Sequence, residues 1–261
     1  MKLIVTTAGR TDEKMIEQAK SVAYDLHVPF VKRQKHSIEH IKATTEADVI
    51  VVGKERVELH IQGESDSIFF HPNSSMFRVK RLLRGESDPF LEAAQLRKGM
   101  SMLDCTLGLA SDSILASVAV GEEGKVTGIE GNRFIAYLVK QGLKSWKSEV
   151  EEMNEAMKRI IVIHQTFEAY LRCCEDNSFD VVYFDPMFQE EIEESDGIKG
   201  IKNLALYTAL TEETINEAKR VAKRRVVLKD HWKSRRFEQH GFTVYKRKTA
   251  KFHYGIIQTS V

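Results

Sequence analysis

The chain has 261 residues and a net charge of +1, with 42% hydrophobic and 30% charged residues. This size and balance suit one large α/β domain or a catalytic domain with a small appendage, and no apolar run approaches the roughly 20 residues that span a bilayer. Three cysteines, Cys105, Cys173 and Cys174, make a poor disulfide framework, so we expect a cytoplasmic protein. The short apolar start at 3–7 predicts a first strand rather than a signal peptide.

The N-terminal segment, residues 1–71, predicts a small α/β domain. After the strand at 3–7, a helix follows with Thr11 or Asp12 as its cap, and a shorter helix is expected over 37–43. A second strand over 47–53 precedes a hairpin formed by 57–61 and 67–71. The Pro/Ser-rich stretch 72–75 then marks a boundary, so the predicted domains are 1–71 and 72–261.

The second domain, residues 72–261, shows strands and helices in alternation. Helices are expected over 76–83, 88–96, 112–120, 133–143, 149–157, 167–172 and 210–222. Strands are expected over 100–105, 126–130, 160–164, 181–185 and 225–229, and an antiparallel pair over 242–247 and 252–258 closes the series. This alternation predicts a mostly parallel sheet with helices on both faces.

A turn at 104–112 follows the first strand of this domain and contains Gly108. Glycine lets a ligand approach the backbone, and the following helix directs free N–H groups at that ligand. A dinucleotide turn carries three glycines for a pyrophosphate, so a single glycine favours a nucleoside without phosphates. Glu130 ends the next strand, where a carboxylate can accept hydrogen bonds from a ribose diol.

A second motif, Asp185-Pro186-Met187-Phe188, follows the strand at 181–185. Proline stops the strand and turns the chain outward. The Asp185 carboxylate and the Pro186 carbonyl could hold an exocyclic amine so that its lone pair faces an electrophilic methyl group, and Phe188 could stack on a flat base. These three are the candidate catalytic residues.

Together, the stretches 104–112, Glu130, 163–166 and 182–188 resemble class I S-adenosylmethionine-dependent methyltransferases. Within that superfamily the Asp-Pro-Met-Phe tetrad is most similar to the bacterial small-subunit ribosomal RNA guanine-N2 methyltransferases. Ala110 and Ser111 stand where that family tends to carry glycine and arginine. The resemblance covers roughly residues 70–258 and implies a Rossmann-like fold with a seven-stranded sheet and a closing antiparallel strand. No Cys/His spacing indicates a zinc site, so we expect no metal.

The resemblance also implies which residues would contact S-adenosyl-L-methionine. They are Asp104, Thr106, Gly108, Ser111, Asp112, Glu130, Gly131, Thr166, Phe167 and Asp185. The implied substrate is ribosomal small-subunit RNA, methylated on an exocyclic guanine amine.

The region from Lys219 to Lys251 is strongly basic, with 13 Lys or Arg residues against Asp230 and Glu238. It could hold RNA phosphates, or it could be a set of solvated helix faces and strand edges. Trp232 lies among these cations, and aromatic and basic residues interleave in single-stranded nucleic-acid sites. The candidate substrate-binding residues are Lys229, Trp232, Arg235 and Arg236.

Three other functions fit parts of the same pattern. A methyltransferase for a small molecule or a protein would carry a similar motif. A non-catalytic RNA-binding or assembly protein could retain the cofactor pocket. A dinucleotide oxidoreductase is disfavoured because only Gly108 occupies the glycine-rich turn.

Overall fold

The computed structural model describes residues 2–186, 210–247 and 250–259. These residues divide into two compact units: residues 2–71 form the first, and the described residues from Pro72 onward form the second. Each unit has its own sheet.

The first unit contains a four-stranded sheet in the order β1-β2-β3-β4. Its strands are β1 (Leu3–Thr7), β2 (Asp48–Val52), β3 (Val57–His60) and β4 (Ser67–Phe69). The first two run parallel, and the others pair antiparallel, as the hairpin prediction required. Helix α1 (Glu13–Asp25) begins where Asp12 accepts a hydrogen bond from the Met15 N–H at 2.8 Å, and Ser37 caps α2 (Ile38–Thr45) in the same way.

The second unit contains a seven-stranded sheet in the order β10-β11-β9-β8-β5-β6-β7. Its strands are β5 (Ser101–Asp104), β6 (Lys125–Glu130), β7 (Ile161–His164), β8 (Phe179–Phe184), β9 (Ala222–His231), β10 (Thr243–Tyr245) and β11 (Phe252–Gln258). The five strands from β9 to β7 run parallel, whereas β11 pairs antiparallel with both β9 and β10. The predicted fold class is therefore confirmed.

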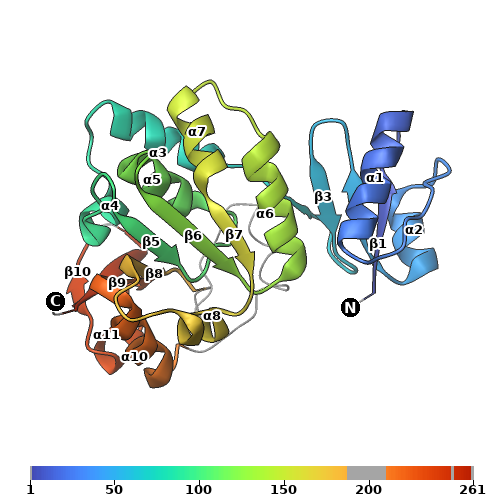
Figure 1. Cartoon of the computed structure of the whole chain (residues 1–261). Coiled ribbons are helices and arrows are strands. Elements are labelled where there is room, and N and C mark those ends of the chain that lie inside the picture. The colour runs from blue at the N-terminus through green and yellow to red at the C-terminus, as the bar shows by residue number, and fades with distance from the viewer. Residues whose placement is uncertain (1, 187–209, 248–249, 260–261) are drawn as a thin grey trace. The chain divides into compact units, whose positions relative to one another are not determined.

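Helices cover both faces of this sheet (Figure 1). One face carries α8 (Phe167–Cys173), α10 (Glu212–Val221) and α11 (Arg236–Gln239), which share a buried apolar core with β5, β8 and β9. The other face carries α4 (Pro89–Ala94), α5 (Ser111–Val120) and α6 (Arg133–Ser145), while α3 (Asn73–Leu83) and α7 (Glu151–Arg159) pack against α5. The inner parallel strands such as β5 and β8 are consequently buried on both sides, whereas the edge strand β7 has no buried residue.

The strand order places a topological switch point between β5 and β8. The chain moves from β5 outward to β6 and β7, and then returns to the other side of β5 as β8. Asp104 of β5 lies in register with Gly128 of β6 and Tyr183 of β8. The carboxyl ends of these three strands meet at one edge, which is where open α/β sheets bind ligands.

Among the residues that the structure describes, no helix is long and apolar enough to cross a membrane.

Candidate active site

The turn after β5 is organised by the buried carboxylate of Asp104. One oxygen accepts a hydrogen bond from the Thr106 N–H at 3.0 Å, and the other accepts one from Ser113 Oγ at 2.7 Å. Burial raises the pKa of Asp104 to about 7, although these two hydrogen bonds oppose the shift. Asp104 therefore fixes the conformation of the turn through these two hydrogen bonds.

Two small residues let this turn lie close to the sheet and leave space above it. A Cβ at Gly128 would lie 2.3 Å from Leu107 Cδ1, so only glycine lets Leu107 pack on β6. Gly108 has a φ of +48°, and a Cβ added there would meet no described residue nearer than the Thr106 carbonyl oxygen at 4.0 Å. The backbone at 108 is thus accessible to a ligand.

Glu130 ends β6 and contacts the same turn. Its carboxylate accepts hydrogen bonds from the Gly108 N–H at 3.1 Å and the Asn132 N–H at 2.8 Å. Burial raises the pKa of Glu130 above its ordinary value, while the N–H groups of Asn132, Gly108 and Gly131 partly offset that effect.

Asp185 contacts this turn from the other neighbouring strand, β8. Its backbone N–H donates to Thr106 Oγ1 at 2.6 Å. Glu130 and Asp185 therefore flank one turn and bond to residues only two positions apart, Gly108 and Thr106. The Glu130 carboxylate and the Asp185 backbone N–H thus both bond to this turn, whereas the Asp185 carboxylate bonds to Lys229.

A buried ionic cluster lies behind this edge and links α3, α4 and α5. Arg78 of α3 donates two hydrogen bonds to the Asp88 carboxylate, each at 2.9 Å, and a third to Asp112 Oδ1 at 2.6 Å. Tyr183 Oη donates to Asp112 Oδ2 at 2.7 Å. Burial alone would raise the pKa of Asp112, but the charges of Lys229 and Arg78 outweigh it and hold that pKa below its ordinary value.

Lys229 connects the cluster to Asp185. Its ammonium nitrogen lies 2.6 Å from Asp185 Oδ2 and 3.3 Å from Asp112 Oδ2. Burial would lower the pKa of Lys229, but these carboxylates outweigh burial and raise it. Burial raises the pKa of Asp185, and the Asp112 charge adds to this, whereas Lys229 opposes it.

The other predicted cofactor residues occupy varied positions. Thr166 is exposed and caps α8, whereas Phe167 is buried and packs edge-on against Phe184 with ring centroids 5.7 Å apart. Ser111 opens α5, and Ser75 Oγ donates to its hydroxyl at 3.2 Å. Pro186 follows Asp185 and is half-buried, and Phe188 lies outside the described residues.

The four predicted substrate residues fall into two groups. Trp232 is 50% exposed just beyond the carboxyl end of β9, and Arg235 is exposed nearby. Lys229 and Arg236 instead form ion pairs with acids, because Arg236 Nη1 lies 3.0 Å from Asp230 Oδ2 and Lys229 contacts Asp185.

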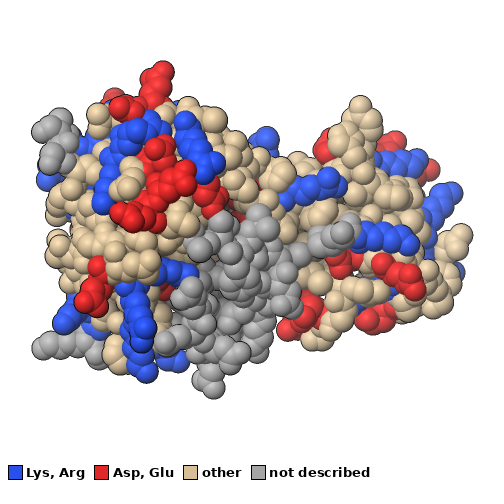
Figure 2. Space-filling view, turned by 90° about the horizontal axis from the view of Figure 1, so that it is seen from below, with Lys and Arg blue, Asp and Glu red and all other residues tan. Residues whose placement is uncertain are grey.

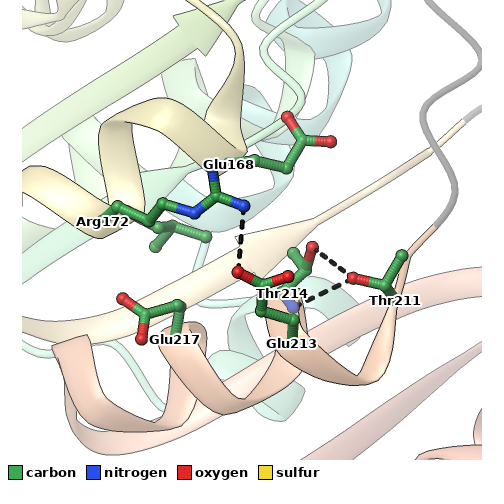
Figure 3. Close-up of a pocket in the computed structure, with 7 residues that line it drawn as sticks. Glu168, Arg172, Thr211, Glu213, Thr214 and Glu217 are labelled. Atoms are coloured by element: carbon green, nitrogen blue, oxygen red, sulfur yellow. Dashed lines mark hydrogen bonds and ion pairs between the residues drawn. The ribbon is translucent and has the colours of Figure 1, made fainter.

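A pocket of about 220 Å³ lies elsewhere, between α8 and α10 (Figure 3). It is lined by Glu168, Leu171, Arg172, Thr211, Glu213, Thr214 and Glu217. Arg172 donates to Glu213 at 2.9 Å across it, and Thr211 Oγ1 accepts from the Thr214 N–H at the start of α10. None of the predicted site residues that the structure describes lines this pocket.

Sequence reasoning missed Arg78, Asp88 and Tyr183. Arg78 lies 34 positions before Asp112 in a basic helix that also carries Lys80 and Arg81, so its spacing gave no signal. The Tyr183 hydroxyl could have been suspected, because a buried tyrosine in an apolar strand requires a hydrogen-bond partner.

Comparison with known proteins assigns the family. The family SAM_MT, described as "Putative SAM-dependent methyltransferase", matches residues 32–255. The chain belongs to this family, and it is an S-adenosylmethionine-dependent methyltransferase. The match begins inside the first unit, well before residue 70, where the resemblance in the sequence motifs begins.

Two curated proteins and one solved structure are similar to the chain. YpiP of Bacillus subtilis (strain 168) is 52% identical over 257 residues, which cover 98% of this chain and 100% of that protein. Ribosomal RNA small subunit methyltransferase J of Acinetobacter baylyi is 31% identical over 128 residues, 46% of this chain and 45% of that protein. The SAM-dependent methyltransferase NGO1261 of Neisseria gonorrhoeae shares the fold at a TM-score of 0.63 and 15% identity, over 98% of this chain and 96% of that one.

The residues at the sheet edge fit the cofactor of this family. No described side chain blocks a ligand from approaching the Gly108 backbone, and Glu130 offers carboxylate oxygens at the end of the adjacent strand. A ribose diol needs such acceptors, and the single glycine suits a nucleoside without phosphates. The predicted cofactor is therefore confirmed, whereas its individual contacts stay predictions.

Proposed function

We propose that the protein transfers a methyl group to the exocyclic amine of a guanine in ribosomal small-subunit RNA. The observation that carries this proposal is the position of Asp185, which follows β8 and contacts the same turn as Glu130. The partial similarity to ribosomal RNA small subunit methyltransferase J supports the choice of RNA. The Asp-Pro-Met-Phe tetrad at 185–188 supports an amine acceptor.

We assign the cofactor to the turn after β5. Glu130 would accept hydrogen bonds from its ribose, and Asp104, Thr106, Gly108, Ser111, Asp112, Gly131, Thr166 and Phe167 complete the proposed contacts. When bound, S-adenosylmethionine would supply a methyl group on a sulfonium sulfur, and this sulfur would keep the electrons of the broken carbon–sulfur bond while the amine nitrogen bonds to the methyl carbon.

The protein contributes orientation and hydrogen bonding to this reaction. The Asp185 carboxylate and the Pro186 carbonyl accept hydrogen bonds from the amine, so that its lone pair is directed at the methyl carbon. The methylated nitrogen must then lose a proton. Asp185, whose side chain is 27% exposed, can accept that proton and release it to water.

RNA is proposed to contact the surface around Trp232. The ring of Trp232 is half exposed and carries the Lys233 ammonium 5.0 Å from its centroid, while Arg235 is exposed close by. Such an arrangement can stack on a base and contact phosphates. Figure 2 shows both blue and red side chains on the described part of this face of the molecule.

Residues 1–71 and 72–261 are proposed to be separate domains, with the cofactor and catalytic residues confined to the second. The hydrogen bonds given above for the site all join residues from 75 onward.

The proposal is tested by incubating the purified protein with labelled S-adenosylmethionine and unmodified small-subunit RNA, followed by mass spectrometry of the nucleosides. We expect labelled N2-methylguanosine. Asp185→Asn should lower the rate by about 100-fold or more, because it removes a charged acceptor in the transition state.

Asp176→Asn provides the matched control, since Asp176 is an acid with a 72% exposed side chain that pairs with Arg220 away from the sheet edge. It should methylate at the wild-type rate. Label in a small molecule or a protein, with none in RNA, would contradict the proposed substrate.

A further inference from the structure

We propose that Lys229 is a positioning residue for methyl transfer, which acts by holding the Asp185 carboxylate in place and in its ionised form rather than by gripping RNA phosphates. This inference rests on the proposed function of Asp185. It assigns to Lys229 a different role from the substrate contact that its basic surroundings predict.

The first support is the local geometry. The Lys229 ammonium nitrogen lies 2.6 Å from Asp185 Oδ2 and 3.3 Å from Asp112 Oδ2, and it therefore bridges two carboxylates. Its side chain is only 18% exposed. The Phe252 ring covers it, with the ring centroid 5.0 Å from the nitrogen. Such an ammonium is poorly placed to reach a phosphate in solvent.

The second support is the chain of alternating charges behind Lys229. Arg78 bridges Asp88 and Asp112, and Lys229 bridges Asp112 and Asp185, so three carboxylates alternate with two cations. The order is Asp88, Arg78, Asp112, Lys229 and Asp185. Removing Lys229 would leave the Asp112 and Asp185 carboxylates facing each other without a cation, which disfavours their ionisation.

Among the residues that the structure describes, the titratable and charged groups that interact with Asp185 come from β5, α5, β8, β9 and β11. They are Asp104, Asp112, Tyr183, Lys229, Asp230 and Tyr254. Lys229 lowers the pKa of Asp185, and Asp112 raises it. Lys229 and Asp112 thus move the pKa of Asp185 in opposite directions. Substitutions at these two positions can therefore distinguish an electrostatic role from a merely structural one.

The experiment is a carboxyl ¹³C NMR titration of Asp185 in the full-length protein, with the signal assigned by its loss in Asp185→Asn. Lys229→Met should raise the midpoint by at least about one pH unit, as loss of an adjacent cation does. Asp112→Asn should lower it. Lys229→Arg keeps the charge and should keep the midpoint near the wild-type value.

The matched control is Arg224→Met, which removes a positive charge from the other end of β9. The Arg224 side chain is 56% exposed and pairs with Asp180 at 3.2 Å. It should leave the midpoint unchanged. A wild-type midpoint in Lys229→Met, or shifts of the same sign in Lys229→Met and Asp112→Asn, would overturn the inference. If Lys229→Met does not fold, the Asp112→Asn titration still decides it, because a midpoint that does not fall contradicts the network.

An activity measurement separates this inference from the proposed function. The acidic limb of the pH–rate profile should move to higher pH in Lys229→Met, in parallel with the carboxyl midpoint. The titration itself needs no methyl acceptor. Shifted midpoints without RNA methylation would therefore reject only the proposed substrate, and RNA methylation with unshifted midpoints would reject only the role of Lys229.

Discussion

Asp104 makes folding stability depend on pH. Burial raises the pKa of this side chain to about 7 in the folded protein, whereas an exposed aspartate ionises near pH 4. An acid whose pKa is raised by folding binds its proton more tightly when folded, so its contribution to stability is lost as the pH rises toward 7.

The Asp104→Asn variant should remove this loss, because the amide can still accept from Thr106 and donate to Ser113. The difference in the free energy of unfolding between the variant and wild type should increase in favour of the variant by about 3 kcal/mol from pH 5 to pH 8. Urea unfolding at the two pH values measures the difference. An equal effect of the substitution at both values would contradict the buried, raised pKa.

The predictability of the site differed between residues for a physical reason. That Glu130 and Asp185 lie at the same sheet edge was predictable, because Glu130 ends β6, Asp185 follows β8, and parallel strands bring their carboxyl ends together. Arg78 was not, because it reaches the site from a helix earlier in the chain, and helical periodicity does not distinguish it from its basic neighbours. The pairing of Lys229 with Asp185 likewise depends on β9 lying beside β8, which only the sheet order reveals.

At the scale of elements, β6 and the turn after β5 depend on a close contact between Gly128 and Leu107. A methyl group at position 128 would overlap the Leu107 side chain. Gly128→Ala should therefore lower the free energy of unfolding by about 1–3 kcal/mol through overpacking.

A double-mutant cycle isolates this contact. In a Leu107→Ala background the same Gly128→Ala change should cost less, because the overlapping side-chain carbons are gone. Chemical denaturation of the four proteins gives the coupling energy. Strictly additive effects would show that the turn does not rest on β6 in the way described.

Most elements could be predicted from periodicity and capping residues, and their ends were the least certain. Of the two cap candidates for the first helix, Thr11 and Asp12, Asp12 is the residue that caps α1. Strand β9 runs over Ala222–His231, beyond the predicted 225–229, because its ends pair with β8 and β11 through long-range contacts. The short α11 was missed because four residues carry too little helical periodicity.

At the scale of the whole molecule, the basic region is less available to RNA than its composition indicates. Among the 13 cations from 219 to 251, the described structure pairs Arg220, Arg224, Arg225, Lys229 and Arg236 with protein groups. Lys248 lies outside the described residues. Seven cations therefore remain for phosphates.

RNA affinity should accordingly fall as the salt concentration rises, and the number of available cations limits how steep this fall can be. If all seven cations contact single-stranded RNA, the slope of log affinity against log salt is about −5. We expect a slope of that size or shallower in a fluorescence titration over a range of salt concentrations, and a weaker affinity for Trp232→Ala at every salt concentration. A markedly steeper slope would place phosphates on other surfaces as well.

The central claim is that the turn after β5, flanked by Glu130 and Asp185, binds the cofactor. Calorimetric titration with S-adenosylmethionine tests it most directly. The wild-type protein should bind one equivalent, and Glu130→Gln should weaken binding by about tenfold or more, since hydrogen bonds to a charged group contribute about 1.5–3 kcal/mol. Glu213→Gln, in the pocket between α8 and α10, should bind as wild type does. Loss of binding in Glu213→Gln with full binding in Glu130→Gln would contradict the account.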